Sequence, residues 1–233
     1  YVNRFDSEGL PDFIIKDIPP TSSFPELKVT RPEIYFGEHI TSHSFVNTTQ
    51  AEFDYPQGEN DVTCFYKGTG GVKIGSGLRR LFFALKFDGW STMRSAYLNA
   101  DSKVMFYRSI YQRAKKIAPF LLYDTDAYPV LTKDGRIFLI LDAYTIAKSY
   151  PYSAFISIGM KRINYFHNAV KVVMDCYNGG IKLYQFEKED PILNAWKGIF
   201  PNMFTPADQM PTDIREHVRY PKDFLSVQAE IYK

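Results

Sequence analysis

Residues 128–141, YPVLTKDGRIFLIL, decide the fold class because they read as a β-hairpin. Asp134 and Gly135 stand between two apolar runs, and glycine accepts the positive φ that a tight hairpin turn requires. Alternate residues of a strand face opposite sides, and residues 137–141 are all apolar, so both faces of this strand are apolar. The strand is therefore predicted to be central in a sheet.

A second hairpin is predicted where residues 169–177 and 181–186 flank Asn178-Gly179-Gly180. Capping residues, apolar stripes and prolines predict helices around the two hairpins. The predicted helices are one after Ser76 with a stripe of Leu78, Leu81, Phe82 and Leu85, a longer one from Asp101 or Ser102 to Pro119, and short ones after Asp190, Pro211 and Pro221. The predicted class is α+β, with antiparallel β-hairpins packed against several α-helices.

The first 33 residues are predicted to form an extended arm that lies along the surface of the core. Prolines at positions 11, 19, 20, 25 and 32 disfavour both helix and central strand in this stretch. Residues 34–233 are then expected to form the α+β domain. Within it, residues 148–165 are the candidate for an internal linker, because they hold Pro151, Ser153 and Gly159.

The composition is that of a globular protein. The 233 residues are 45% hydrophobic and 23% charged, and 19 Phe and 17 Tyr supply too much apolar area for an intrinsically disordered chain. No apolar run approaches the roughly 18 residues that a membrane span needs. Cys64 and Cys176 neither demand nor exclude an oxidising compartment, and the sequence leaves open whether they pair. No signal peptide is evident, and a start at Tyr1 leads us to expect an excised fragment.

Positive charge is concentrated in one segment of the chain. Residues 71–116 hold ten basic and two acidic residues, a formal charge of +8, which leaves −6 for the remainder because the whole chain carries +2. Such asymmetry indicates either a surface for polyanions or a basic layer that pairs with acidic loops of the same molecule. Nucleic acid is not the expected polyanion, because the signatures of nucleic-acid-binding modules are missing. The residues expected to bind an anion are Arg79, Arg80, Arg108, Arg113 and Lys116.

The glycine-rich stretch at residues 68–77 precedes the first predicted helix. It does not match a phosphate-binding loop, because Ser76 stands where that motif has its lysine. It does not match a dinucleotide-binding motif either, because Lys73 takes the place of the third glycine. Two interpretations remain: a structural turn, or an anion site at a helix N-terminus beside Arg79 and Arg80.

Three carboxylates form the other candidate site. Asp124 and Asp126 could offer oxygen ligands to a hard cation such as Ca²⁺. Asp142 follows the strand with two apolar faces, which places it either in the interior with a partner or at the mouth of the strand. No nucleophile–base pair or catalytic motif is evident, so we expect no catalytic residues and no cofactor.

The whole chain resembles the C-terminal, extracytoplasmic part of an uncharacterised bacterial family of large polytopic membrane proteins. The matching stretches are residues 9–13 (GLPDF), 31–38 (RPEIYFGE), 52–56 (EFDYP), 79–85 (RRLFFAL), 117–121 (IAPFL), 141–145 (LDAYT), 150–153 (YPYS) and 219–223 (RYPKD). In that family, predicted transmembrane helices precede a large soluble region, and no biochemical activity is settled. The resemblance therefore implies a soluble domain on the outer side of the cell membrane, anchored through segments outside this sequence.

The expected function is that of a non-catalytic envelope domain that binds an anionic ligand or a protein partner. Anionic lipid headgroups, wall polymers or another envelope protein are the expected partners in that location. An alternative is a metal-dependent enzyme or binder that uses Asp124, Asp126 and Asp142. A third is a scaffold that only holds partner subunits, in which the exposed aromatic side chains would matter more than charge.

Overall fold

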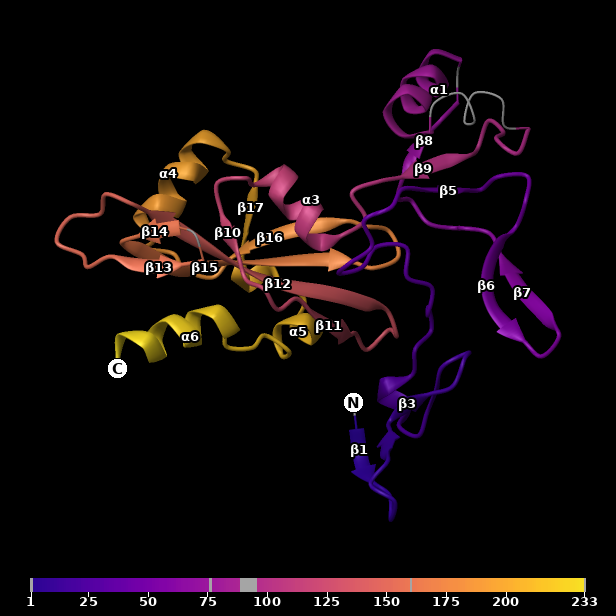
Figure 1. The fold of residues 1–233 in the computed structure, drawn as a ribbon, viewed down its shortest axis with the longest axis horizontal. Coiled ribbons are helices and arrows are strands. Elements are labelled where there is room, and N and C mark those ends of the chain that lie inside the picture. The colour runs from indigo at the N-terminus through magenta and orange to yellow at the C-terminus, as the bar shows by residue number, and fades with distance from the viewer. Residues whose placement is uncertain (1, 76, 89–95, 160, 233) are drawn as a thin grey trace. The chain divides into compact units, whose positions relative to one another are not determined.

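The computed structural model describes residues 2–75, 77–88, 96–159 and 161–232 (Figure 1). The fold is α+β with mostly antiparallel strand pairing, as the sequence predicts. The chain divides into two compact units. Unit 1 consists of Tyr1–Ser109 and Cys176–Gly179, and unit 2 consists of Ile110–Asp175 and Gly180–Lys233.

Unit 2 is built on a six-stranded sheet with the order β10-β12-β15-β16-β17, in which β11 also pairs with β12. The strands are β10 (Leu122–Tyr123), β11 (Tyr128–Leu131), β12 (Ile137–Ala147), β15 (Tyr165–Asp175), β16 (Ile181–Gln185) and β17 (Phe204–Pro206). All of these pairs are antiparallel except β16 with β17. The prediction of a central strand is confirmed, because β12 pairs with β15 on one edge and with β10 and β11 on the other.

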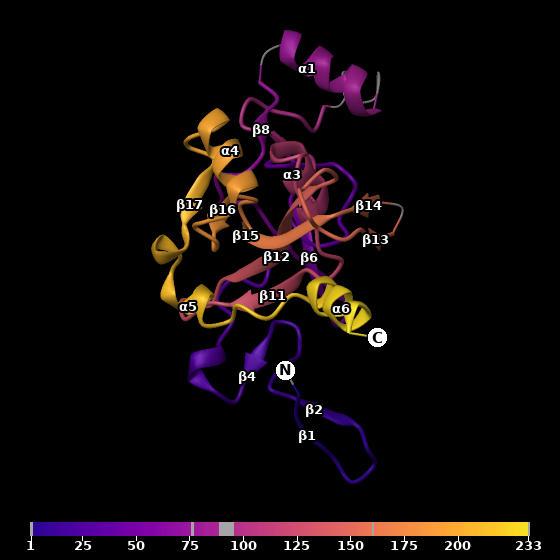
Figure 2. The same cartoon turned by 90° about the vertical axis from the view of Figure 1, so that its left-hand side faces the viewer.

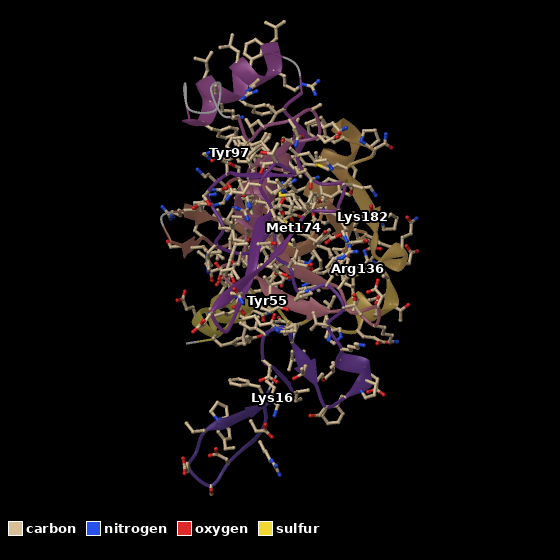
Figure 3. The ribbon with its side chains drawn as sticks, turned by 90° about the vertical axis from the view of Figure 1, so that its right-hand side faces the viewer. Lys16, Tyr55, Tyr97, Arg136, Met174 and Lys182 are labelled. Carbon is tan, nitrogen blue, oxygen red and sulfur yellow. The ribbon has the colours of Figure 1, made fainter. Side chains whose placement is uncertain are left out.

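Both predicted hairpins are confirmed. Tyr128 faces Ile140 and Leu131 faces Ile137 across the first turn, where Gly135 takes a φ of 78°. The second hairpin joins β15 to β16, and Gly179 at its tip takes a φ of 69°. The interior of the sheet is closely filled, and Met174 of β15 has no exposed surface (Figure 3).

Helices cover both faces of this sheet. Figure 2 shows α3 (Ile110–Ile117) and α4 (Pro191–Ile199) on one face, and α5 (Thr212–Arg215) and α6 (Lys222–Ile231) on the other. The apolar cluster on the α5 side contains the buried residues Tyr128, Val130, Ile140, Val173, Tyr184, Met210 and Ile214. A short hairpin of β13 (Ile156–Ile158) and β14 (Lys161–Ile163) falls within residues 148–165.

Unit 1 is described by short strands, a 3-10 turn and a longer helical segment. The first residues form the hairpins β1 (Val2–Phe5) with β2 (Pro11–Phe13) and β3 (Ile15–Lys16) with β4 (Thr21–Ser22), followed by the 3-10 turn Pro25–Leu27. The later strands are β5 (Ser44–Val46), β6 (Glu52–Gln57), β7 (Asn60–Cys64), β8 (Val72–Lys73) and β9 (Lys103–Met105). Strands β5, β9 and β8 form one sheet, and β6 pairs with β7. The α-helix α1 (Gly77–Phe83) continues as a π-helical turn, Ala84–Asp88.

The prediction of one long helix from Asp101 or Ser102 to Pro119 is wrong. Residues 103–105 form β9 instead, with Val104 and Met105 fully buried between β5 and β8. Ser102 does not cap a helix, because its hydroxyl donates to the carbonyl oxygen of Asn47 at 2.9 Å. Tyr107 has a φ of 49°, which a continuous right-handed helix excludes. Only the second half of the prediction survives, as α3.

Candidate functional site

Asp142 lies in the interior of unit 2, opposite a lysine. Asp142 on β12 and Lys171 on β15 are direct partners across the strands, and the Lys171 ammonium donates to Asp142 Oδ1. Their side chains are only 3% and 5% exposed. Asn168 also donates to Asp142 Oδ1, at 3.2 Å, because the register of β15 shifts in this region. Of the two placements that the sequence leaves open, the structure shows the buried one with a partner.

Burial dominates the chemistry of Asp142. It raises the pKa of this carboxyl group even though the neighbouring ammonium and amide groups act in the opposite direction. A carboxylate that is closed in by a lysine and an asparagine has little access to solvent or to a substrate. The Asp142–Lys171 pair therefore has a structural role in the sheet.

Asp124 accepts three hydrogen bonds within unit 2, one from its own loop and two from other segments. Its Oδ2 accepts from the Tyr144 hydroxyl and from the backbone N–H of Asp223 at 3.0 Å, and its Oδ1 accepts from the N–H of Asp126 at 2.9 Å. Burial and the Asp124 carboxylate both raise the pKa of Tyr144. Asp124 thus connects the end of β10 to β12 and to the first turn of α6.

A second set of hydrogen bonds holds the N-terminal end of α6. Thr125 donates its backbone N–H and its hydroxyl to the Asp223 carboxylate, at 3.0 and 2.9 Å. Asp223 lies in the first turn of α6. The backbone N–H groups of a first helical turn have no partner within the helix, so a carboxylate there is stabilising. Together, Asp124 and Asp223 fasten α6 to the sheet in a reciprocal arrangement.

The structure brings the three predicted carboxylates near one another without making a metal centre of them. Asp124 is joined to Asp142 through a backbone hydrogen bond from Asp124 N to Asp142 O, at 3.0 Å. Asp126 is half-buried and contributes its N–H to the network. Across the described parts of the chain, no three His, Cys, Asp or Glu side chains are grouped so that they could hold a metal ion.

Sequence reasoning missed a third buried carboxylate, Asp190, except as a helix cap. Asp190 does cap α4, because its Oδ1 accepts from the N–H of Leu193 at 2.7 Å. Its Oδ2 accepts from Thr145 at 2.6 Å and Tyr165 at 2.9 Å, and lies 3.1 Å from Nδ1 of His167. Burial alone would raise the pKa of Asp190, but these hydrogen bonds outweigh burial and lower it. The Asp190-Pro191 pair predicts the cap, whereas the partners on β12 and β15 depend on the sheet register.

The five predicted basic site residues fall into three places. Arg79 and Arg80 are neighbours on α1, and Arg108 lies near the end of the main segment of unit 1. Arg113 and Lys116 belong to unit 2, where they lie one turn apart on α3. A single contiguous patch made of all five remains a prediction.

Two of these arginines are drawn into the fold. Arg108 donates from Nε to the carbonyl oxygen of Tyr35 at 2.7 Å, within unit 1. Arg113 is half-buried on α3. Burial lowers the pKa of both guanidinium groups. The most exposed of the predicted arginines is Arg79, which lies on α1.

The glycine-rich stretch before α1 is a close-packed turn. A Cβ at Gly68 would lie 2.5 Å from Asn178 Oδ1, and a Cβ at Gly70 would lie 2.3 Å from the backbone oxygen of Asn178. The N–H groups of Thr69 and Gly70 donate to Asn178 Oδ1 at 2.9 Å and to the Tyr66 hydroxyl at 2.7 Å. Of the two interpretations that the sequence leaves open, this packing favours the structural turn for residues 68–70.

The stripe predicted for α1 is not the face that packs. The inner side is formed by Ala84, which is 2% exposed, and by Phe83 and Phe87, whose rings contact Phe106. Of the predicted stripe residues, Leu81 is half-buried, whereas Leu78, Phe82 and Leu85 are 72%, 67% and 74% exposed. Side chains on the outer side of α1 project into open space (Figure 3). We call the exposed residues Leu78, Arg79, Phe82 and Leu85, together with the half-buried Arg80, the α1 surface.

Comparison with known proteins places the chain in a family. The model of the Uncharacterised protein family (UPF0182) matches residues 1–233. The chain belongs to the UPF0182 family. It is 45% identical over 231 residues to a UPF0182 protein of Desulforamulus reducens and 46% identical over 231 residues to one of Pelotomaculum thermopropionicum, with 99% of the chain covered in each case. No solved structure matches the chain.

The chain matches only part of the length of each of these relatives. It spans 24% of the length of the Desulforamulus relative and 25% of the Pelotomaculum relative, so it corresponds to about a quarter of each. The family resemblance predicted from the sequence motifs is therefore confirmed. Within the residues that the structure describes, no helix has both the length and the apolar character that crossing a membrane requires.

Proposed function

We propose that this UPF0182 region is a non-catalytic, extracytoplasmic binding domain of a multi-pass membrane protein, and that its basic segment binds an anionic ligand of the cell envelope. The observation that carries the proposal is the exposed, basic α1 surface. Arg79 and Arg80 stand on a helix that leaves most of its outer face in solvent. The extracytoplasmic location is part of the proposal, and the family resemblance supports it.

The charge around this surface favours an anion. Residues 62–87 contain no Asp or Glu, and they contain Lys67, Lys73, Arg79, Arg80 and Lys86. Part of this charge is used inside unit 1: Lys73 pairs with Asp101 at 3.3 Å, and Lys86 lies 4.8 Å from the centre of the Phe106 ring. Arg79, which donates from Nη1 to the carbonyl oxygen of Lys73 at 3.2 Å, is the exposed cation of the α1 surface, and the half-buried Arg80 lies next to it in sequence.

The buried carboxylates do not support the alternative of a metal-dependent enzyme. Asp124 and Asp142 are each 2% exposed, and each accepts hydrogen bonds from neighbouring groups of unit 2. Their partners hold strands and α6 together. A role in the fold accounts for all of their described contacts.

Co-sedimentation with liposomes tests the proposal. The purified chain is mixed with anionic and with neutral vesicles, each at low and at high salt, and the R79Q/R80Q variant is compared with a K148E/K182E variant of unit 2. Each cation near an anionic surface contributes about 1 kcal/mol, so loss of both arginines predicts roughly 30-fold weaker partitioning at low salt. Screening by salt should weaken the wild-type interaction as well.

Two results would contradict this proposal. One is equal sedimentation of the R79Q/R80Q variant and the unsubstituted chain. The other is a larger loss for K148E/K182E, which alters exposed lysines far from α1 in sequence. If neither vesicle type nor a soluble polyanion binds the chain, another envelope protein replaces the anion as the expected partner.

A further inference from the structure

The α1 surface carries apolar side chains as well as charge. Leu78 and Phe82 are four residues apart on α1, which places them on one side of that helix, and Leu85 follows on the π-helical turn. Each is at least 67% exposed. Three large apolar side chains exposed within eight residues of one helical segment form a strip, which differs from the scattered single residues that are normal on protein surfaces.

The exposure of this strip is built into the packing of unit 1. The opposite side of the helical segment is anchored by Ala84 and by a group of rings in which Phe83 and Phe87 stack with centres 6.0 Å apart. Phe87 also stacks on His43, at 4.7 Å between ring centres. Because the aromatic side holds the segment, Leu78, Phe82 and Leu85 cannot turn inward without breaking these contacts.

The positive charge beside the strip indicates which kind of surface the strip binds. Arg79 and Arg80 lie between Leu78 and Phe82 in sequence, and Lys86 follows Leu85. A helical segment with apolar side chains on one side, cations at its border and no acidic residue between Gly77 and Phe87 is complementary to an anionic lipid interface. Long basic side chains reach the headgroups while the apolar ones enter the acyl boundary.

We infer that the segment Gly77–Phe87 is an interfacial membrane anchor, which lies in the plane of an anionic bilayer with Leu78, Phe82 and Leu85 in the acyl boundary and Arg79 and Arg80 among the headgroups. This inference rests on the proposed function and narrows its ligand to the lipid surface. A wall polymer would use the arginines, but it would have no use for the three apolar side chains.

The apolar contribution is tested by the L78S/F82S/L85S variant in the same co-sedimentation assay. Its control is I199S/L225S/I231S, which removes three similarly exposed apolar side chains from unit 2. We expect the α1 variant to lose about tenfold or more of its binding to anionic vesicles at high salt, where burial of apolar area outweighs screened charge. The unit 2 variant should bind like the unsubstituted chain.

Insertion depth is tested directly with the F82W variant. Anionic vesicles whose acyl chains carry bromine should quench the fluorescence of the added tryptophan well beyond that of the unsubstituted chain, which holds Trp90 and Trp196. Vesicles without bromine give the baseline. Quenching that is equal in F82W and the unsubstituted chain would overturn the inference.

The outcomes separate the inference from the proposed function. If R79Q/R80Q loses binding while L78S/F82S/L85S keeps it, anion binding stands and insertion is wrong. Insertion is also wrong if soluble polyphosphate competes fully with the vesicles at every salt concentration. If no variant alters binding, both ideas are wrong, and circular dichroism of each variant shows whether its fold is intact.

Discussion

Units 1 and 2 stabilise their interiors by different means. In unit 2, charged groups are buried within a sheet and are satisfied across strands, as Asp142 is by Lys171 and Asp190 is by Thr145 and Tyr165. Among the residues that the structure describes, the buried polar ones of unit 1 are Ser102 and Ser109, both uncharged. Aromatic rings pack against one another in both units, and in unit 1 they are combined with backbone segments that approach closely at glycines.

The difference teaches how each unit specifies its structure. A one-residue shift of β15 would turn Lys171 to the opposite face and leave Asp142 buried without its cation, so the ion pair penalises wrong registers. Ring packing is less directional, and in unit 1 it leaves one side of α1 in solvent. The buried charges of unit 2 thus fix its strand register, whereas unit 1 leaves the large apolar side chains Leu78, Phe82 and Leu85 exposed.

The largest expected effect comes from breaking the buried ion pair. The K171M variant should lose about 3–5 kcal/mol of unfolding free energy, because it leaves the Asp142 carboxylate buried without its positive partner. Urea denaturation followed by circular dichroism measures this loss. The control is K182M, which alters an exposed lysine on the neighbouring strand β16 (Figure 3) and should change stability by less than about 0.5 kcal/mol.

The double variant D142L/K171M sharpens this test. Replacing both charges with apolar side chains removes the unpaired carboxylate, so it should recover part of the loss seen in K171M. If K171M is no less stable than K182M, the pair does not hold the sheet, and the contrast between the two units fails.

The next largest loss of stability is expected when a side chain is added to the glycine-rich turn of unit 1. In G70A, the added Cβ would lie 2.3 Å from the backbone oxygen of Asn178, so the turn must move. We expect a loss of about 1–3 kcal/mol in unfolding free energy, as in overpacked interiors. G77A is the matched control, because nothing lies within 4 Å of a Cβ at that position. Equal stability of the two variants would show that close backbone approach is unimportant in unit 1.

The sequence predicts best where the pattern is local. The turn at Asp134-Gly135 and the five apolar residues 137–141 are sufficient to predict the hairpin and the central position of β12. The Asp190-Pro191 pair likewise predicts the start of α4. In each case a few neighbouring residues determine the backbone, so no long-range contact has to be known.

The sequence predicts the structure poorly where contacts with distant segments of the chain determine it. Asp142 is recognisable as a residue after an apolar strand, but its partner Lys171 depends on the register of β12 against β15. The sequence pattern predicts a helix through residues 103–105, but they form a strand because β5 and β8 flank them. The face of α1 that packs is likewise chosen by rings such as Phe106, which lies 19 residues beyond Phe87.

The smallest expected effect concerns the pH dependence of Asp190, the charged group that links β12 and β15 to α4. Its hydrogen bonds lower its pKa below the ordinary 3.8 in the folded state. The stabilisation is therefore complete above that value, and it is lost as the pH falls through the folded-state pKa, because the native carboxylate must then take up a proton.

The D190N variant isolates this effect, since asparagine still caps the helix but carries no charge to titrate. We expect D190N to be less stable by about 1 kcal/mol at neutral pH and the difference to shrink in acid. Urea denaturation across an acid pH series measures it, with D208N on an exposed turn as the control. If the difference in unfolding free energy between D190N and the unsubstituted chain stays constant in acid, the charge of Asp190 does not contribute to stability. The contrast between charge-linked unit 2 and ring-packed unit 1 would then rest on Asp142 and Lys171 alone.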